Sequence, residues 1–77
     1  MSKVVKVYVV DSNGRGLSGQ RVKEYGGSEM RTDSNGCVSL CLEGSNTTIY
    51  VNRFEAHNGS VSRLEPKIFF NKDGSKY

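Results

Sequence analysis

The 77-residue sequence predicts a small all-β domain, an antiparallel β-sandwich of about six to seven short strands. The tetrapeptide Asp-Ser-Asn-Gly occurs twice, at residues 11–14 and 33–36, and each copy borders a run of alternating apolar residues. Asn-Gly pairs tolerate positive φ and mark tight turns between strands. The apolar runs are rich in β-branched residues, which favours strands over helices. Turns and strands together indicate two sheets packed face to face.

Most of the strands are predicted in the first two thirds of the chain. They cover residues 4–10, 20–25, 30–32, 37–42 and 47–52. Alternation assigns the following side chains to the core: Val5, Val7, Val9, Val22, Val38, Leu40, Leu42, Ile49 and Val51. Leu17 is the one large apolar residue in the glycine-rich stretch between the first two strands. We expect it to plug the end of the core.

The last third of the chain has a weaker pattern. Residues 53–59 are polar and predict no strand, while residues 61–70 predict one or two strands. Pro66 favours an edge position there, because proline cannot donate to a strand ladder. The Lys-Ile-Phe-Phe segment at 67–70 is expected to close the core, and residues 71–77 to form a flexible tail.

Length and charge limit the classes of function. The whole chain, residues 1–77, is predicted to be one domain, near the lower size limit for a self-sufficient core. The net charge of +3 comes from eleven basic and eight acidic residues that are spread along the chain. No run of basic residues indicates a nucleic-acid site, although a sheet could gather Lys6, Arg21, Lys23 and Arg53 on one face.

Two stretches resemble a known family. Residues 7–22, Val-Tyr-Val-Val-Asp-Ser-Asn-Gly-Arg-Gly-Leu-Ser-Gly-Gln-Arg-Val, are similar to the opening of carboxypeptidase regulatory-like domains. These domains are transthyretin-like (prealbumin-like) β-sandwiches. Residues 32–40 match the family's second signature, Thr-Asp-x-x-Gly followed by an alternating strand, and the resemblance covers residues 4–51. It implies an immunoglobulin-like fold and non-catalytic work as a structural, spacer or binding module. The sequence departs from the family at Val38, where an aromatic is common, and matches nothing beyond Asn52.

Two activities of related domains are not expected. Transthyretin-related hydroxyisourate hydrolases use several histidines and a Tyr-Arg-Gly-Ser ending, whereas this chain has only His57 and ends in Gly-Ser-Lys-Tyr. Related adhesin domains form an isopeptide bond from a lysine two residues before the first Asp, a position held here by Val9. His57 is expected to be a solvated loop residue, and no carboxylate is placed to orient it. No catalytic residue is predicted, and the chain is not expected to be an enzyme.

The cysteines and the acidic turns do not predict a metal or cofactor site. Cys37 and Cys41 share one face of a strand, with Cα atoms roughly 13 Å apart, while a disulfide needs about 7 Å. Two free, half-buried thiols are expected, with an intermolecular bond or a redox role as the alternative. Neither Asp-Ser-Asn-Gly copy has the spacing of a calcium loop, so Asp11 and Asp33 are expected to cap backbone amides.

The predicted function is that of a non-catalytic structural or protein–protein interaction module, acting through an outer sheet face or an edge strand. Tyrosine beside arginine or lysine is typical of binding surfaces. The candidate surface consists of Lys6, Tyr8, Lys23, Tyr25, Tyr50 and Arg53. The partner would be an unidentified protein, a parent protein or a second copy of the chain. The alternative is a basic β-domain that binds nucleic acid or another polyanion, with a steep salt dependence.

Location is predicted from what the sequence lacks. No apolar stretch approaches the roughly 20 residues of a membrane span, so none is predicted. The first residues, Met-Ser-Lys-Val-Val-Lys-Val, do not form a signal peptide. The expected location is therefore cytoplasmic, unless the chain is an excised domain of an exported protein.

Overall fold

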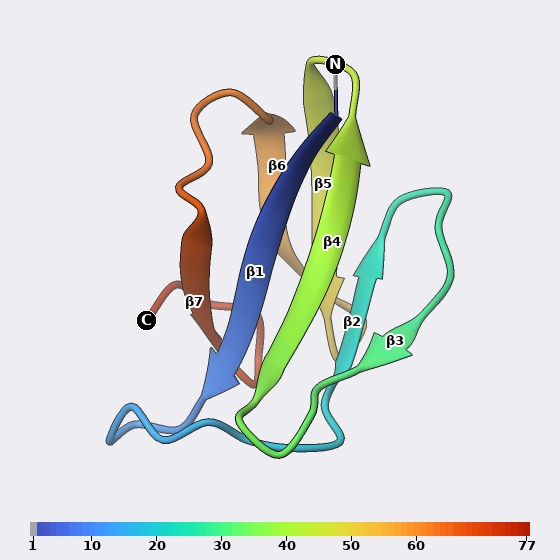
Figure 1. Cartoon of the computed structure of the whole chain (residues 1–77). Helices are drawn as coiled ribbons and strands as arrows, with labels where there is room; N and C mark the ends of the chain where they lie inside the picture. Colours follow the sequence, from blue (N-terminus) through green and yellow to red (C-terminus); the bar gives the residue numbers. More distant parts are fainter. Residues whose placement is uncertain (1) are drawn as a thin grey trace.

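The computed structural model describes residues 2–77, which form seven strands and contain no helix (Figure 1). The strands are β1 (Ser2–Val10), β2 (Arg21–Glu24), β3 (Met30–Arg31), β4 (Cys37–Glu43), β5 (Asn46–Val51), β6 (Phe54–Ser60) and β7 (Lys67–Asn71). No helix in the described range is therefore long and apolar enough to cross a membrane.

The strands form two sheets, as predicted. The three-stranded sheet has the order β4-β1-β7, and the four-stranded sheet has the order β3-β2-β5-β6 (Figure 1). One pairing differs from the wholly antiparallel arrangement that the sequence predicts, because β1 and β7 are parallel. The reason is topological. The chain returns to the sheet of β1 twice, first antiparallel in β4 and then, after β5 and β6 in the other sheet, parallel in β7. A parallel pair of this kind requires a crossover connection.

The core lies between the sheets and confirms the predicted inward faces. All nine side chains assigned to it by alternation are buried, and Leu17 packs against them. Val61, Leu64 and Phe70 complete the same cluster from the last third of the chain. Burial of a valine, leucine or isoleucine contributes about 1.5–3 kcal/mol, so this continuous cluster is the main source of stability.

The last third of the chain differs most from the prediction. Residues 54–60, predicted to be outside any strand, form the edge strand β6, and residues 61–70 supply only β7. β6 has no apolar alternation because it lies at a sheet edge and is interrupted by a bulge opposite Ile49 and Tyr50, where Ala56 has no partner. Polar residues suit such a strand, which is half exposed.

Residues 71–77 do not extend as the expected tail. They turn back along β7, where the Asn71 amide donates to the Ser75 carbonyl at 2.8 Å and the Tyr77 amide to the Phe69 carbonyl at 3.2 Å. Gly74 lies against the start of β6, since a Cβ there would be 2.9 Å from the Phe54 Cβ. The C-terminal residues therefore cover the free edge of β7 and join it to the other sheet.

The two Asp-Ser-Asn-Gly copies form the same turn. Asp11 Oδ1 accepts from the amides two and four residues later, each at 2.9 Å, and Asp33 Oδ1 does the same at 2.8 and 3.1 Å. Gly14 and Gly36 have φ of 83° and 77°, which a residue with a side chain adopts only at a cost. The predicted capping of backbone amides by the aspartates is confirmed.

Candidate functional site

The candidate site is a basic concavity on the outer face of β2 and β5. Val22 is fully buried, so alternation turns its neighbours Arg21 and Lys23 outward. In β5 the same alternation turns Tyr50 outward, and the register places it directly opposite Lys23. Two adjacent strands thus bring two cations and one aromatic ring onto one face.

A strained turn adds the third cation. Val51 pairs with Phe54, which leaves Asn52 and Arg53 as a two-residue hairpin loop with φ of 50° and 71°. A loop with positive φ at both positions is a type I′ turn, whose second residue is commonly glycine. Arginine in this conformation costs about 1–2 kcal/mol. This backbone conformation places the Arg53 side chain at the rim of the concavity.

The Asn52 side chain fixes this loop to its surroundings. Its Oδ1 accepts from the Arg21 amide at 3.0 Å, and its Nδ2 donates to Gln20 Oε1 at 3.0 Å and to the Lys72 carbonyl at 2.8 Å. The Asn52 amide also donates to the Arg21 carbonyl at 2.7 Å. The loop that carries Arg53 is therefore attached to the start of β2 and to the C-terminal turn.

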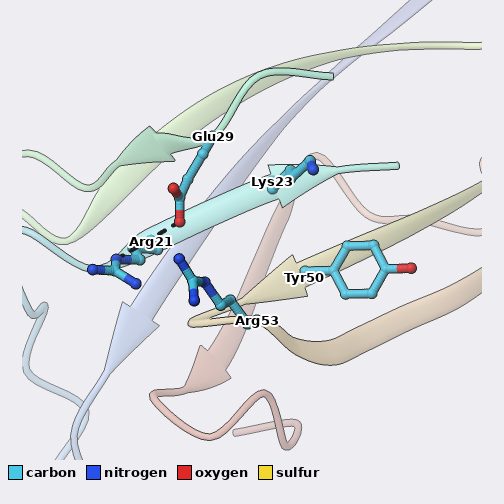
Figure 2. A pocket seen from close by; sticks show the side chains of 5 residues that line it. All are labelled: Arg21, Lys23, Glu29, Tyr50 and Arg53. Carbon is cyan, nitrogen blue, oxygen red and sulfur yellow. Dashed lines mark ion pairs between the residues drawn. The ribbon is translucent and has the colours of Figure 1, made fainter. Parts of the chain in front are cut away.

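The concavity has a volume of about 370 Å³. Its walls are formed by Arg21, Lys23, Glu29, Tyr50 and Arg53 (Figure 2). Figure 2 shows the Arg53 guanidinium directed towards Arg21 and Glu29, while the Tyr50 ring extends away along the surface.

One carboxylate partly balances the three cations of this site. Arg21 Nε lies 3.7 Å from Glu29 Oε1, and both side chains are about 40% exposed, at 41% and 40%. An exposed ion pair of this kind contributes about 0–1 kcal/mol, because water and salt screen it. Excess positive charge remains on the face, and it favours an anionic ligand.

The structure divides the predicted interaction surface between two sheets. Lys23, Tyr50 and Arg53 come together in the concavity. Lys6 and Tyr8 lie on β1, in the other sheet, so the grouping of Lys6 with the β2 cations is wrong. Alternation along a single strand cannot predict which of two sheets that strand joins.

The remaining differences concern one tyrosine and one carboxylate. Tyr25 lies just beyond the end of β2, is 76% exposed and does not line the concavity. Arg21 is not part of the predicted interaction surface, but the sequence groups it with Lys23 and Arg53 as a possible basic face, and these three line the concavity together. Glu29 lies in the loop before β3, and nothing in the sequence pattern indicates that it joins the site.

The outer face of the three-stranded sheet is more apolar. The Tyr8 and Phe69 rings stack with centroids 4.8 Å apart and an interplanar angle of 18°, across the parallel β1–β7 pair. Tyr8 is also opposite Cys37 of β4, and its pKa is raised above the ordinary value, first by a side-chain hydrogen bond with Cys37, then by burial. Both cysteines are free thiols, but Cys41 is exposed rather than half-buried.

His57 differs from its prediction. It lies in β6 rather than in a loop, and it lines a cavity of about 350 Å³ that is bordered by β6, β7 and residues 63–65. Its Nε2 is buried and has no hydrogen-bond partner among residues 2–77. The described part of the chain holds no group of three His, Cys, Asp or Glu side chains that could bind a metal ion.

Comparison of the chain with protein-family models, with curated proteins and with solved structures finds no match. The fold and the site therefore define the class of protein: an all-β, two-sheet domain with a basic, tyrosine-containing concavity on one outer face.

Proposed function

We propose that this chain is a non-catalytic binding module that recognises an acidic segment of a partner protein. The observation that carries the proposal is that Arg21, Lys23, Arg53 and Tyr50 line one concavity on the outer face of β2 and β5. Guanidinium groups bind carboxylates in bidentate geometry, and a lysine adds a mobile point charge. The site thus offers several donors to carboxylates within one concavity.

Two features favour a protein segment over a phosphate chain. Tyrosine and arginine are enriched among the residues that carry most of the energy of protein interfaces. Glu29 lies within the site, where its carboxylate could accept from a backbone amide of a bound peptide, a donor that a phosphate chain lacks. An acidic peptide with an apolar residue fits both the cations and the Tyr50 ring.

A polyanion remains the second candidate, because one further cation extends the face. Arg31 of β3 is directly opposite Arg21 in the register, so both side chains lie on the same face of the sheet. Two like charges directly opposite each other repel, and a bound anion would relieve that repulsion. The salt dependence separates the candidates, since phosphate contacts release counterions and weaken steeply with ionic strength.

The test is a nuclear magnetic resonance titration of nitrogen-15-labelled protein with a polyglutamate peptide that contains one phenylalanine. We expect the amide signals of Arg21, Lys23, Tyr50 and Arg53 to shift. A single-stranded DNA oligonucleotide of equal charge should bind more weakly at physiological salt. Arg53→Gln should weaken peptide binding about fivefold, as the loss of one charge-assisted hydrogen bond predicts.

Lys6→Gln provides the matched control, because it removes the same charge from an exposed residue of the other sheet. It should leave the affinity within about twofold, since an exposed charge so placed acts only through the screened long-range field. Equal losses in the two variants would contradict the site assignment. Tighter, steeply salt-dependent binding of the oligonucleotide would instead support the polyanion.

We also propose that the chain is a divergent member of the carboxypeptidase regulatory-like group of transthyretin-like, immunoglobulin-like domains. The contacts between its two signature segments support this. Thr32 Oγ1 accepts from the Gln20 amide at 2.9 Å and donates to the Leu17 carbonyl at 2.5 Å. Gly36 lies so close to Gly16 that a Cβ would be 2.6 Å from its Cα. An experimental structure whose strand order differs from that of this group would contradict the assignment.

A further inference from the structure

Among the sheet edges formed by residues 2–77, β4 alone is long and unprotected. The edge strand β3 has only two residues, β6 carries the bulge at Ala56, and β7 is covered by the C-terminal residues. Natural proteins blunt edge strands by such devices, because a free edge pairs readily with another chain. β4 has seven residues, keeps an uninterrupted register with β1 and contains neither proline nor lysine.

The free backbone groups of β4 can be assigned from the register. The Val9 amide donates to the Gly36 carbonyl at 2.8 Å, so every second residue of β4 from Val38 onward is bonded to β1. The amides and carbonyls of Ser39, Cys41 and Glu43 consequently point away from β1. Within the described chain these groups have no backbone partner, and the three residues are exposed. The Cys37 amide and carbonyl are occupied by Asp33 of the preceding turn.

We propose that β4 pairs antiparallel with β4 of a second copy of this chain, with the twofold axis at Cys41. Two identical antiparallel edges are self-complementary, and the axis must pass through a residue that faces its own counterpart. With Cys41 on the axis, Ser39 lies opposite Glu43 of the second copy. Every free amide and carbonyl of these three residues then finds a partner.

Two alternative registers fit less well. An axis at Leu40 would place Glu43 opposite Cys37, whose backbone groups are already occupied. An axis at Glu43 would place two carboxylates directly opposite each other, which is destabilising. The Cys41 register also sets Leu40 opposite Leu42 on the inward side, and thereby adds an apolar contact at the seam.

The dimer has two structural consequences. The two three-stranded sheets become one continuous sheet, with the order β7-β1-β4 followed by its symmetric copy. Since the twofold axis is perpendicular to that sheet, both four-stranded sheets lie on the same side of it. The proposal rests on the β4 edge alone and does not depend on the ligand of the basic concavity.

Sedimentation and thiol cross-linking of the full chain test the proposal. Under reducing conditions we expect a species of twice the 8.5 kDa chain mass. Diamide, which takes up two electrons and two protons from two thiols, should then form a Cys41–Cys41 disulfide between copies. The two Cα atoms would be about 5.5 Å apart in a hydrogen-bonded pair, within the range that a disulfide needs. The two Cys37 residues would be about 26 Å apart, at about 3.3 Å per residue.

Matched variants decide the outcome. Cys37→Ser should cross-link like the wild type, and Cys41→Ser should dimerise under reduction but not cross-link. Cys41→Lys should raise the dissociation constant about fivefold, because two like charges then face each other at the axis. A wild type that stays monomeric at millimolar concentration would overturn the proposal. So would a Cys41→Ser variant that cross-links at the wild-type rate, or a Cys41→Lys dimer as tight as the wild type.

Discussion

Two turns of this domain solve the same backbone problem with different residues. The turn at 33–36 places Gly36 at φ 77°, while the loop between β5 and β6 places Arg53 at φ 71°. Gly36 has no room for a side chain, since a Cβ would be 2.6 Å from the Leu17 amide nitrogen. Arg53 carries a long cationic side chain in the same region of φ, on the rim of a concavity.

The difference separates a requirement of the fold from a feature of the surface. A glycine is needed at 36 both for φ and for space, so the residue serves the fold alone. At 53 a glycine would relieve strain, yet arginine is present and supplies a site residue. Strain retained at a surface position, with Asn52 holding the loop in place, is the pattern expected of a functional residue.

The largest effect is expected for Gly36→Ala. The added Cβ meets backbone atoms of Gly16 and Leu17 and must also adopt a left-handed φ. Overpacking and the conformational cost together should lower the free energy of unfolding by about 3 kcal/mol or more. Urea denaturation followed by tyrosine fluorescence measures this change.

Gly44→Ala is the matched control. Gly44 has a similar φ of 81°, but a Cβ there would meet nothing within 4 Å. Only the conformational cost of about 1 kcal/mol should remain. Equal losses in the two variants would show that the contact between Gly36 and Gly16 does not constrain the fold.

The next effect is expected for Asn52→Gly. Glycine keeps the positive φ but removes the hydrogen bonds to the Arg21 amide, to Gln20 and to the Lys72 carbonyl. The free energy of unfolding should fall by about 2 kcal/mol, because partly buried groups lose their partners. Amide hydrogen exchange should also quicken at Arg21. Unchanged exchange there would mean that Asn52 does not hold the hairpin against β2.

The sequence predicted the inward faces of the strands better than the order and direction in which the strands pair. Alternation around Val5, Val22 and Leu40 identifies inward faces because each strand is apolar on one side only. The parallel pairing of β1 with β7 depends on a crossover between distant segments, so no local pattern predicts it. The sequence did not predict β6, because an exposed, bulged edge strand needs no apolar alternation.

The site was predicted in part for the same reasons. Lys23 and Tyr50 could be placed on outward faces from their own strands. Their position opposite each other on β2 and β5, however, depends on register, which comes from tertiary pairing. Glu29 reaches the site through a loop, and Arg53 through a turn in which arginine replaces the expected glycine. A two-residue loop of Asn and Arg has the usual asparagine but lacks the glycine that completes the turn signal.

Arg53→Gly tests whether the strained arginine at position 53 is kept for binding. Removal of a side chain from a left-handed position should raise the free energy of unfolding by about 1 kcal/mol, and thermal denaturation measures the gain. The same change should weaken the acidic peptide about fivefold, as Arg53→Gln does. Arg53→Gln keeps the strain and should leave stability unchanged. A glycine variant that is both more stable and equally tight in binding would contradict a functional role for the arginine.

The smallest effect concerns the third turn, at 71–75, where Asp73 Oδ1 accepts from Ser75 Oγ at 2.6 Å and from the Ser75 amide at 3.0 Å. The Ser75 side chain, more than any other group, lowers the pKa of Asp73 below its ordinary value. A carboxylate with a depressed folded-state pKa contributes its stability above the unfolded pKa of about 3.9, and this contribution is lost as pH falls through the folded value.

Ser75→Ala should therefore raise the pKa of Asp73 towards the ordinary value and flatten the dependence of stability on pH below about 4. A carbon-13 titration of the Asp73 carboxyl measures the shift. Ser62→Ala is the control, because Ser62 Oγ bonds to Ser60 Oγ at 2.8 Å rather than to a carboxylate. An unchanged Asp73 titration in Ser75→Ala would mean that the turn is held by its backbone and by Gly74 alone. The aspartates of the first two turns would then be the ones to test for a contribution to folding.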